Sequence, residues 1–378
     1  MTRILSREGA IWLGVAFVIG FCGWFKNINL MLLMAEVMAA MIVVNYWFAR
    51  RQVRRVEAKR LTSPPAFAGE TFRHAAEVCN PSISPVTVSV HSTAAKHQSN
   101  WFVPQLPPGE SRKMIAEWRF EARGIYFTPP LVVRSGDPFG LIRYDRPVGD
   151  GHEFVILPRL GQVDLSGLRR WLIRTGAGDA RTRRPVRRPG IHHADVRGVR
   201  PYRPGDQLRD IHWRTTARRD ELTVREYDST EPLDLIVVLD PWLPATSTNA
   251  SKERFEWAVT MIASIAWAWA EADESAHVTL VIPGGDPPVR TIPSTRLAMR
   301  HALVPLARIR GSEESRPIPA GIFRRESNRC ARLLVTSRPQ SPMLGELRQS
   351  TGVPFVPLDP TMDPVWFLPP QPEARLAH

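Results

Sequence analysis

The chain has 378 residues, of which 43% are hydrophobic and 23% charged, so it is long enough for two or three domains and too apolar for wholesale disorder. The formal net charge of +13 favours an anionic partner, either a nucleic acid or a membrane surface. The cysteines Cys22, Cys79 and Cys330 are far apart, which excludes a disulfide framework and indicates a reducing compartment.

Two apolar stretches predict a transmembrane hairpin within residues 1–60. Residues 9–25 carry no charge, and residues 30–49 carry one carboxylate, Glu36. Both approach or reach the roughly 20 residues that a helix needs to cross the hydrocarbon core. A cleaved signal peptide is the alternative, but no small-residue cleavage site follows the first stretch and the second stretch comes at once.

The flanking charges predict how this hairpin is oriented. Arg3 and Arg7 precede the first stretch and the basic run 50–60 follows the second, whereas the turn between them has only Lys26. The positive-inside rule then places both ends in the cytoplasm. We therefore expect a protein of the inner (cytoplasmic) membrane with two spans and the bulk of the chain in the cytoplasm.

Residues 61–158 have the pattern of a small antiparallel β-sandwich. Short alternating runs are separated by Pro and Gly breaks roughly every ten residues, as in linked strands. The alternating positions include Val86, Val88 and Val90 in one run and Ile115, Glu117 and Arg119 in another. The sequence LPPGE at 106–110 predicts a tight turn.

An arginine-rich segment follows at 159–230, with fifteen arginines between 169 and 219. Arginine density favours nucleic-acid or anionic-polymer binding by residues 169–219. Interleaved acids argue against a continuous positive field and favour paired Arg–carboxylate forks that stiffen the segment. In that second interpretation Asp206 caps a short helix, and Ile211 and Trp213 anchor the segment to the neighbouring sheet.

Strands and helices alternate through residues 231–358, which predicts a parallel sheet covered by helices. The continuous apolar run 233–240 is typical of a buried strand. Residues 251–273 predict a helix capped by Ser251. Its apolar stripe comprises Phe255, Val259, Ile262, Ala266 and Trp269. Further strands are expected at 277–283, 331–337 and 353–359, further helices at 294–309 and 342–351, and a Pro-rich extended arm at 359–378.

Asp240 ends the first of these strands, where an α/β sheet binds its ligands. A carboxylate there suits Mg²⁺ when hydroxyls follow two and four residues later. Those positions hold Trp242 and Pro244, so the sequence argues against a tight metal site and implies no certain cofactor. No Walker loop, G-x-S-x-G or H-E-x-x-H is present, so no enzymatic activity is expected.

Two motifs resemble the bacterial domain-of-unknown-function 58 family. The first, which we call the signature segment, spans 200–226, and the second, the hallmark loop, is SGDPFGLIR at 135–143. The matching signature residues include Arg200, Tyr202, Gly205, Asp206, Arg209, Trp213, Arg218, Arg225 and Glu226. Those of the hallmark loop are Asp137, Pro138, Phe139 and Gly140.

The resemblance implies two N-terminal spans, a β-rich domain and a von Willebrand factor A-like α/β domain. It also implies a MoxR-type AAA+ ATPase as partner and a part in protein maturation, metal insertion or envelope functions, without a defined enzymatic activity. Family members often carry a serine two residues after the aspartate, resembling the metal-binding pattern D-x-S-x-S, of which this chain keeps only Asp240. We expect a membrane-anchored adaptor whose signature segment either contacts a partner or braces two domains.

Overall fold

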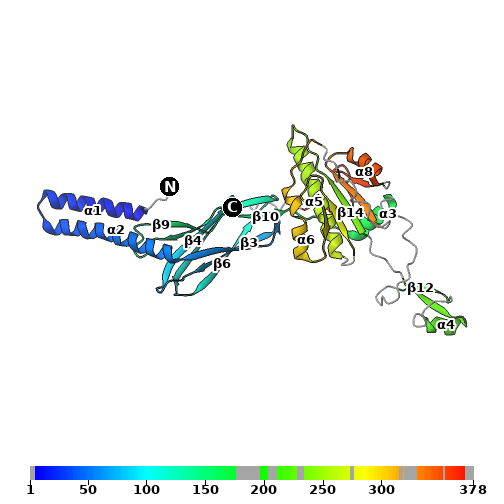
Figure 1. The fold of residues 1–378 in the computed structure, drawn as a ribbon, viewed down its shortest axis with the longest axis horizontal. Coiled ribbons are helices and arrows are strands. Elements are labelled where there is room, and N and C mark those ends of the chain that lie inside the picture. Colours follow the sequence, from blue (N-terminus) through cyan, green and yellow to red (C-terminus); the bar gives the residue numbers. More distant parts are fainter. Residues whose placement is uncertain are drawn as a thin grey trace. The chain divides into compact units, whose positions relative to one another are not determined.

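The computed structural model describes residues 5–175, 196–202, 211–227, 234–272, 276–314, 318, 330–351 and 354–370. It comprises two compact units. Unit 1 contains Met1–Arg159 with Leu306–Arg308, and unit 2 contains Leu160–Pro305 with Ile309–His378. Figure 1 traces the elements of both.

Unit 1 begins with two antiparallel helices, α1 (Arg7–Phe25) and α2 (Asn29–Arg55). Both are long and apolar enough to cross a membrane, which confirms the predicted apolar spans. The helices approach closely at Gly23, where an added Cβ would lie 2.9 Å from the backbone nitrogen of Leu32. Most other side chains of the pair are exposed, as expected for surfaces that face lipid.

Helix α2 runs past residue 49, where the apolar stretch ends, to Arg55. Its last turn enters the β-rich part of unit 1, and the side chains of Val53 and Val56 are fully buried there. The chain then turns directly into strand β1 (Glu57–Leu61). Part of the basic run 50–60 is therefore a structural joint between a helix and a sheet.

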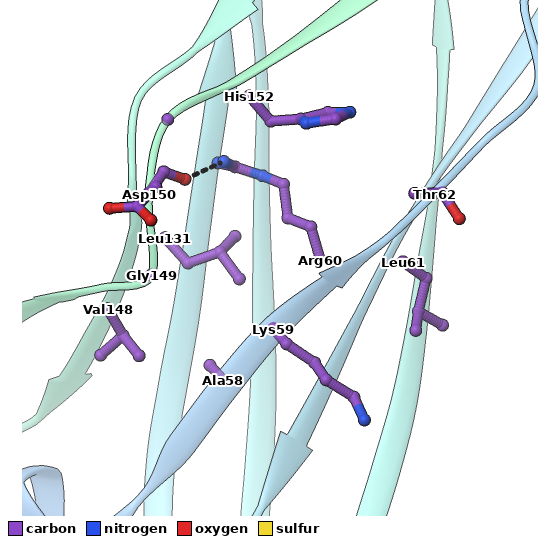
Figure 2. Close-up of a pocket in the computed structure, with 11 residues that line it drawn as sticks. Ala58, Lys59, Arg60, Leu61, Thr62, Leu131, Val148, Gly149, Asp150 and His152 are labelled. Carbon is purple, nitrogen blue, oxygen red and sulfur yellow. Dashed lines mark hydrogen bonds between the residues drawn. The ribbon is translucent and has the colours of Figure 1, made fainter.

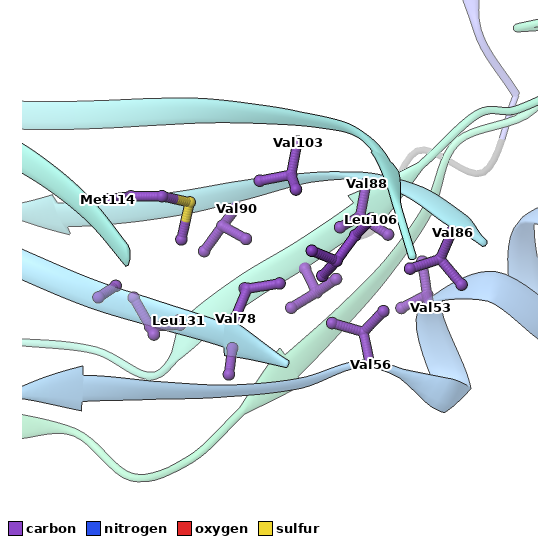
Figure 3. Packing of buried hydrophobic residues seen from close by; sticks show 13 residues of the cluster. Val53, Val56, Val78, Val86, Val88, Val90, Val103, Leu106, Met114 and Leu131 are labelled. Carbon is purple, nitrogen blue, oxygen red and sulfur yellow. The ribbon is translucent and has the colours of Figure 1, made fainter. Parts of the chain in front are cut away.

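Two antiparallel sheets face each other across an aliphatic core (Figure 3). The first sheet has the order β1-β3-β6, with β3 at Thr71–Cys79 and β6 at Ser111–Arg119. The second has the order β5-β4-β8-β9, comprising His97–Leu106, Val86–Ala94, Leu131–Ser135 and Tyr144–Val148. The predicted β-sandwich is thus present as small antiparallel sheets.

A third small sheet extends this unit, with the order β2-β10-β7. It comprises Ala66–Phe67, His152–Leu157 and Gly124–Thr128. Its core is aromatic: Phe72 stacks on Phe154 with ring centroids 4.6 Å apart, and Trp118 and Phe120 complete the cluster. Aromatic rings bury a large apolar area with few side chains, which suits such a short sheet.

The alternation in the sequence predicts strands at both of these runs, and both are strands. Val86, Val88 and Val90 are buried as expected. In β6 the buried residues are Met114 and Trp118, whereas Ile115 is 63% exposed. The alternation of β6 is therefore real, and its even-numbered residues Met114 and Trp118 lie on the inner face.

Unit 2 is built on a five-stranded sheet with the order β16-β15-β14-β17-β18. Strands β14 (Asp234–Asp240), β15 (Val278–Val281), β17 (Cys330–Thr336) and β18 (Val356–Leu358) are parallel. The edge strand β16 (Val289–Ile292) is antiparallel. The sheet is therefore mixed, because the expected helix at 294–309 is preceded by a hairpin strand.

Helices cover this sheet. Helix α5 (Asn249–Ala272) buries the whole predicted stripe from Phe255 to Trp269. Its first turn is capped by Thr248, whose Oγ1 accepts the N–H of Ser251 at 3.2 Å, so Ser251 is not the cap. Helix α8 (Met343–Thr351) packs Met343 and Leu347 into a core with strands β14 and β17.

Two expected elements of unit 2 take another form. The helix expected at 294–309 is split into α6 (Arg296–Ala302) and α7 (Val304–Arg308), because Pro305 cannot continue an unbroken helix. The expected arm after 359 is partly folded: β19 (Phe367–Leu368) pairs with β11 (Gln162–Val163), and Trp366 and Phe367 are buried. Helix α3 (Leu165–Thr175) follows β11.

Candidate functional site

The sheet of unit 2 brings Asp240 and the chain after β17 together. Strand β14 pairs with β15 on one side and with β17 on the other, so the chain reverses its winding direction between β14 and β17. Such a switch point is where open α/β sheets bind ligands, at the carboxyl ends of the strands. Asp240 lies opposite Thr336 at the last position of this ladder. We call the residues gathered here the carboxyl-edge site.

Three side chains surround the carboxylate of Asp240, which is a buried residue. Thr336 Oγ1 lies 3.1 Å and Ser341 Oγ 2.6 Å from Oδ2 of Asp240. Arg338 Nε donates to the same oxygen at 3.1 Å. A buried carboxylate is stable when it is paired with a cation and hydrogen-bonded, and Arg338 is the cation here.

Arg338 is itself held in place. Its guanidinium carbon lies 4.9 Å from the ring centroid of Trp242, a cation–π distance. Ser337 Oγ donates to the carbonyl oxygen of Trp242 at 2.6 Å, which ties the loop after β17 to the loop after β14. Trp242 occupies the position at which the D-x-S-x-S pattern has a hydroxyl, and its ring instead contacts the guanidinium of Arg338.

The residues of the carboxyl-edge site do not fit Mg²⁺. Oδ2 of Asp240 is surrounded by three donors, one of them a guanidinium whose charge repels a metal ion. Thr248, one of the hydroxyls that arrive later in the sequence, caps helix α5 instead. In the described parts of the chain no group of three or more His, Cys, Asp or Glu residues is placed to hold a metal ion.

The hallmark loop lies in unit 1 and is held by both N-terminal helices. Ser6 Oγ, at the start of α1, donates to the carbonyl oxygen of Leu141 at 2.8 Å. A Cβ at Gly9 would lie 1.9 Å from that same oxygen, so only glycine permits this approach. On α2, the buried amide of Asn45 donates to Gly136 O at 2.9 Å and accepts the N–H of Ile142 at 2.8 Å.

The four matched residues of this loop are shaped by the same contacts. Gln52 of α2 donates to Asp137 Oδ2 at 2.8 Å, and a cis peptide bond joins Asp137 to Pro138. Gly140 has a φ of 71°, a left-handed conformation that favours glycine. Phe139 is 47% exposed. The hallmark loop thus binds both N-terminal helices and fixes the helix pair to the sandwich.

The signature segment forms a hairpin with a short helix. Strand β12 (Val196–Pro201) pairs with β13 (Thr223–Tyr227), which places Arg200 opposite Val224 and Gly198 opposite Glu226. Tyr202 follows β12, and Arg225 lies opposite Val199 in β13. Gly205, Asp206 and Arg209, together with the expected cap at Asp206, lie outside the described residues.

Helix α4 (Trp213–Arg219) completes this segment. Its inner side is polar: Thr216 Oγ1 lies 3.1 Å from Thr223 Oγ1, and the capping His212 accepts the N–H of Thr215. Ile211 is buried and bridges to Val224. The expectation that Trp213 anchors the segment is wrong, because its side chain is 64% exposed.

The expected forks between arginines and carboxylates are not found on α4. Arg214, Arg218 and Arg219 are exposed, as are the acids Asp220 and Glu221 at its end. Within the described residues of α4 and its C-terminal turn, no ion pair joins them. Both signs of charge therefore face solvent side by side.

Unit 1 contains a cavity of about 240 Å³ that the sequence does not predict (Figure 2). It lies between β1 and the turn before β10, and Arg60 reaches across it. The guanidinium donates to the carbonyl oxygens of Asp150, at 3.3 Å, and Pro129, and burial lowers the pKa of Arg60. Because these carbonyls hold the terminal nitrogens of Arg60 from the other side of the cavity, the arginine serves to close the sandwich.

The fold defines a chain with two apolar N-terminal helices, a unit of small antiparallel sheets and a unit with a mixed, largely parallel sheet. Residues 198–342 match the family described as protein of unknown function DUF58. This match covers the signature segment at 200–226 and so confirms its resemblance to the family. The match includes both Asp240 and Arg338 of the carboxyl-edge site.

The chain is also similar to a Bacillus subtilis protein described as uncharacterized protein YeaD. The two are 33% identical over 75 residues, which cover 20% of this chain and 17% of that relative. Among solved structures, the CARDB domain of a Pyrococcus furiosus protein is 13% identical and aligns with a TM-score of 0.21. The alignment covers 27% of this chain and 92% of that domain. A Listeria innocua β-glucosidase aligns with a TM-score of 0.19 at 13% identity, covering 27% of this chain and 16% of the enzyme.

Proposed function

We propose that this protein is a membrane-anchored adaptor that binds a protein partner through helix α4 of the signature segment. The observation that carries the proposal is the exposure of Trp213, at 64%, inside the region matched by the family. An exposed tryptophan costs free energy in water unless a partner covers it. Tryptophan and arginine are also the residue types most enriched at the energetic centres of protein interfaces.

The geometry of α4 supports a contact surface better than a brace. Trp213 and Arg214 precede Ala217 and Arg218 by four residues each, so the four side chains share one side of the helix. Trp213, Arg214, Ala217 and Arg218 are all exposed. On the opposite side, Thr216 Oγ1 accepts the N–H of Thr223 and so holds the helix to β13, while Thr215 Oγ1 lies 2.7 Å from Nδ1 of the capping His212.

The partner we propose is a MoxR-type AAA+ ATPase, which the family resemblance implies, in protein maturation or an envelope-related process. A von Willebrand factor A-like identity for unit 2 is part of the same proposal. It is supported by the order of the sheet, by its antiparallel edge strand and by the aspartate that ends β14. The two apolar helices support an anchor in the inner membrane, with the bulk of the chain on the cytoplasmic side.

The test is co-purification of the full chain from membranes with a MoxR-type ATPase in the presence of ATP. Trp213→Ala and Arg218→Ala should each reduce capture by about tenfold or more, since a central interface residue contributes about 2 kcal/mol or more. Leu297→Ala and Arg348→Ala remove an exposed apolar and an exposed basic residue elsewhere in unit 2 and should leave capture unchanged. No captured ATPase, or equal capture by all four variants, contradicts the proposal.

A second candidate function, anionic-polymer or nucleic-acid binding, is favoured by the exposed arginines of α4. Its signature is a steep fall in affinity with salt, because each neutralised phosphate releases counterions. Binding of single-stranded DNA to the full chain, titrated with salt, separates the two. A steep dependence of the DNA affinity on salt that is lost in Arg214→Ala and Arg218→Ala favours polymer binding. Weak DNA binding that hardly depends on salt contradicts this second function.

A further inference from the structure

The carboxyl-edge site contains an arginine that is fixed in position but only partly used. Arg338 Nε is bound to Asp240, and the guanidinium lies over the ring of Trp242. The backbone N–H of Arg338 also donates to Thr336 Oγ1 at 3.2 Å. Because three contacts fix the residue from the backbone to the guanidinium, the direction of its two terminal nitrogens is set before any ligand arrives.

Neither of those two nitrogens has an acceptor among the described residues. Nη2 of Arg338 is buried, whereas Nη1 is not. A guanidinium has five N–H donors, and a buried donor without an acceptor costs about 1–3 kcal/mol. The side chain of Arg338 is still 18% exposed, so a ligand can reach Nη1 from solvent. The site therefore lacks an acceptor that an incoming group can supply.

The charges of the site define the chemical class of that group. The carboxylate of Asp240 is 2% exposed, lies behind the guanidinium and is already paired through Nε. The remaining edge of the guanidinium is positive and planar. A carboxylate suits this cation, since its ionised oxygen accepts a short, charge-assisted N–H bond from the exposed Nη1. The aromatic face of Trp242 prevents the arginine from turning away.

We propose that the carboxyl-edge site binds a carboxylate group and that Arg338 is its built-in cation. Arg338 then stands between two carboxylates, with Asp240 fixed behind it and the ligand in front, in the place where a metal ion does not fit. The site is separate from the surface on α4 and does not depend on the identity of the partner that binds there.

The test is fluorine NMR of the full chain in detergent micelles, labelled with 5-fluorotryptophan. The resonance of Trp242 is assigned by its loss in Trp242→Phe among the twelve tryptophans. Titration with acetate should shift this resonance saturably. Neither acetamide, which has the same shape without the charge, nor sodium chloride at equal ionic strength should do so. The resonance of Trp269, fully buried in the same unit, should stay unchanged.

Two variants connect the shift to Arg338. Arg338→Lys keeps the charge without the planar edge and should weaken acetate binding by about tenfold, the loss of one charge-assisted hydrogen bond. The double variant Asp240→Asn with Arg338→Met removes the carboxylate and the guanidinium together, so that no unpaired charge stays buried. It should abolish the acetate-dependent shift of the Trp242 resonance. An unmoved Trp269 resonance confirms that each variant is folded. If the double variant is not folded, the acetate affinity of Arg338→Lys alone tests the proposal.

Three results would overturn the proposal: no acetate-dependent shift of Trp242, an equal shift with acetamide or chloride, or an unchanged affinity in Arg338→Lys. None of these measurements uses an ATPase. Failure of the docking surface on α4 and failure of the carboxylate site are therefore distinguishable.

Discussion

His74, on strand β3, is an imidazole enclosed by aromatic rings. Its ring stacks on Trp118 with centroids 4.2 Å apart, and Nε2 lies 2.9 Å from Ser92 Oγ. Burial lowers the pKa of His74 to about 4, with smaller contributions from the positive charges of Arg60 and His152. The folded protein therefore keeps this imidazole neutral at pH values where an unfolded chain protonates it.

The sign of the pH dependence follows from this lowered pKa. Between the ordinary histidine pKa of about 6.5 and the folded value, the unfolded state binds a proton that the folded state does not. We expect the free energy of unfolding to fall as the pH drops through this range, by up to about 3 kcal/mol, and to level off below it. Chemical denaturation at pH 7 and pH 4.5 measures the difference.

Replacing the imidazole isolates its contribution. His74→Gln cannot take up the proton and should remove most of the pH dependence. His152→Gln removes an exposed imidazole from the same unit and should leave most of it. An unchanged pH dependence in His74→Gln would show that other groups cause the acid sensitivity.

At the same scale, sequence alone could locate half of the carboxyl-edge site. Asp240 ends an apolar run, so its place at a strand end follows from local pattern. Arg338 reaches it only because β17 pairs with β14, a contact between residues 98 positions apart in the chain. No local signal marks that pairing, and Arg338 sits among fifty Lys and Arg residues, so its role becomes visible only in three dimensions.

At the scale of elements, the helix pair and the hallmark loop act as one joint through Asn45. This side chain is 0% exposed and makes one hydrogen bond to Gly136 and one to Ile142. Asn45→Ala leaves the partly buried carbonyl of Gly136 and the buried N–H of Ile142 without these partners, at a cost of about 1–3 kcal/mol each. We expect the unfolding free energy to fall by about 3 kcal/mol and proteolysis within 135–143 to accelerate.

A matched asparagine provides the control for this joint. Asn100→Ala on β5 removes an exposed amide from the same unit and should change neither stability nor cleavage. If Asn45→Ala and Asn100→Ala are cut equally slowly within the hallmark loop, the loop is held by other contacts and the role of Asn45 is refuted.

Elements with a one-sided apolar pattern could be predicted from sequence, and those without it could not. The stripe of α5 and the run of β14 are examples of the first kind. Strand β1 lies in a charged run, and β5 begins with the polar residues HQSN, so neither shows clear alternation. The edge strand β16 has only four residues. Pairing with a neighbouring strand, which no local pattern records, stabilises all three.

At the scale of the whole molecule, the joint connects the helical hairpin to the sandwich of unit 1 at the arginine-rich end of α2. The last turns of α2 carry Arg50, Arg51, Arg54 and Arg55. Arg51 lies over the ring of Trp47 at 5.1 Å, a pairing typical of the boundary between hydrocarbon and headgroups. Arg146 donates to the carbonyl oxygens of Val53 and Arg54. Arginines thus collect where the helices meet the sandwich, and the opposite turn has Lys26 alone.

This asymmetry predicts that the sandwich lies on the cytoplasmic side and the turn at Lys26 on the outer side. Two exposed lysines give a matched pair of reporters: Lys26→Cys in the turn and Lys96→Cys between β4 and β5, each in a chain whose three native cysteines are replaced by serine. In bacterial cells with an opened outer membrane, a membrane-impermeant maleimide should label Lys26→Cys at once. It should label Lys96→Cys only after lysis, because the inner membrane shields that side. The reverse order would place the sandwich outside the cytoplasm. A cytoplasmic AAA+ ATPase could not reach α4 from there, and the adaptor proposal would fall with the orientation.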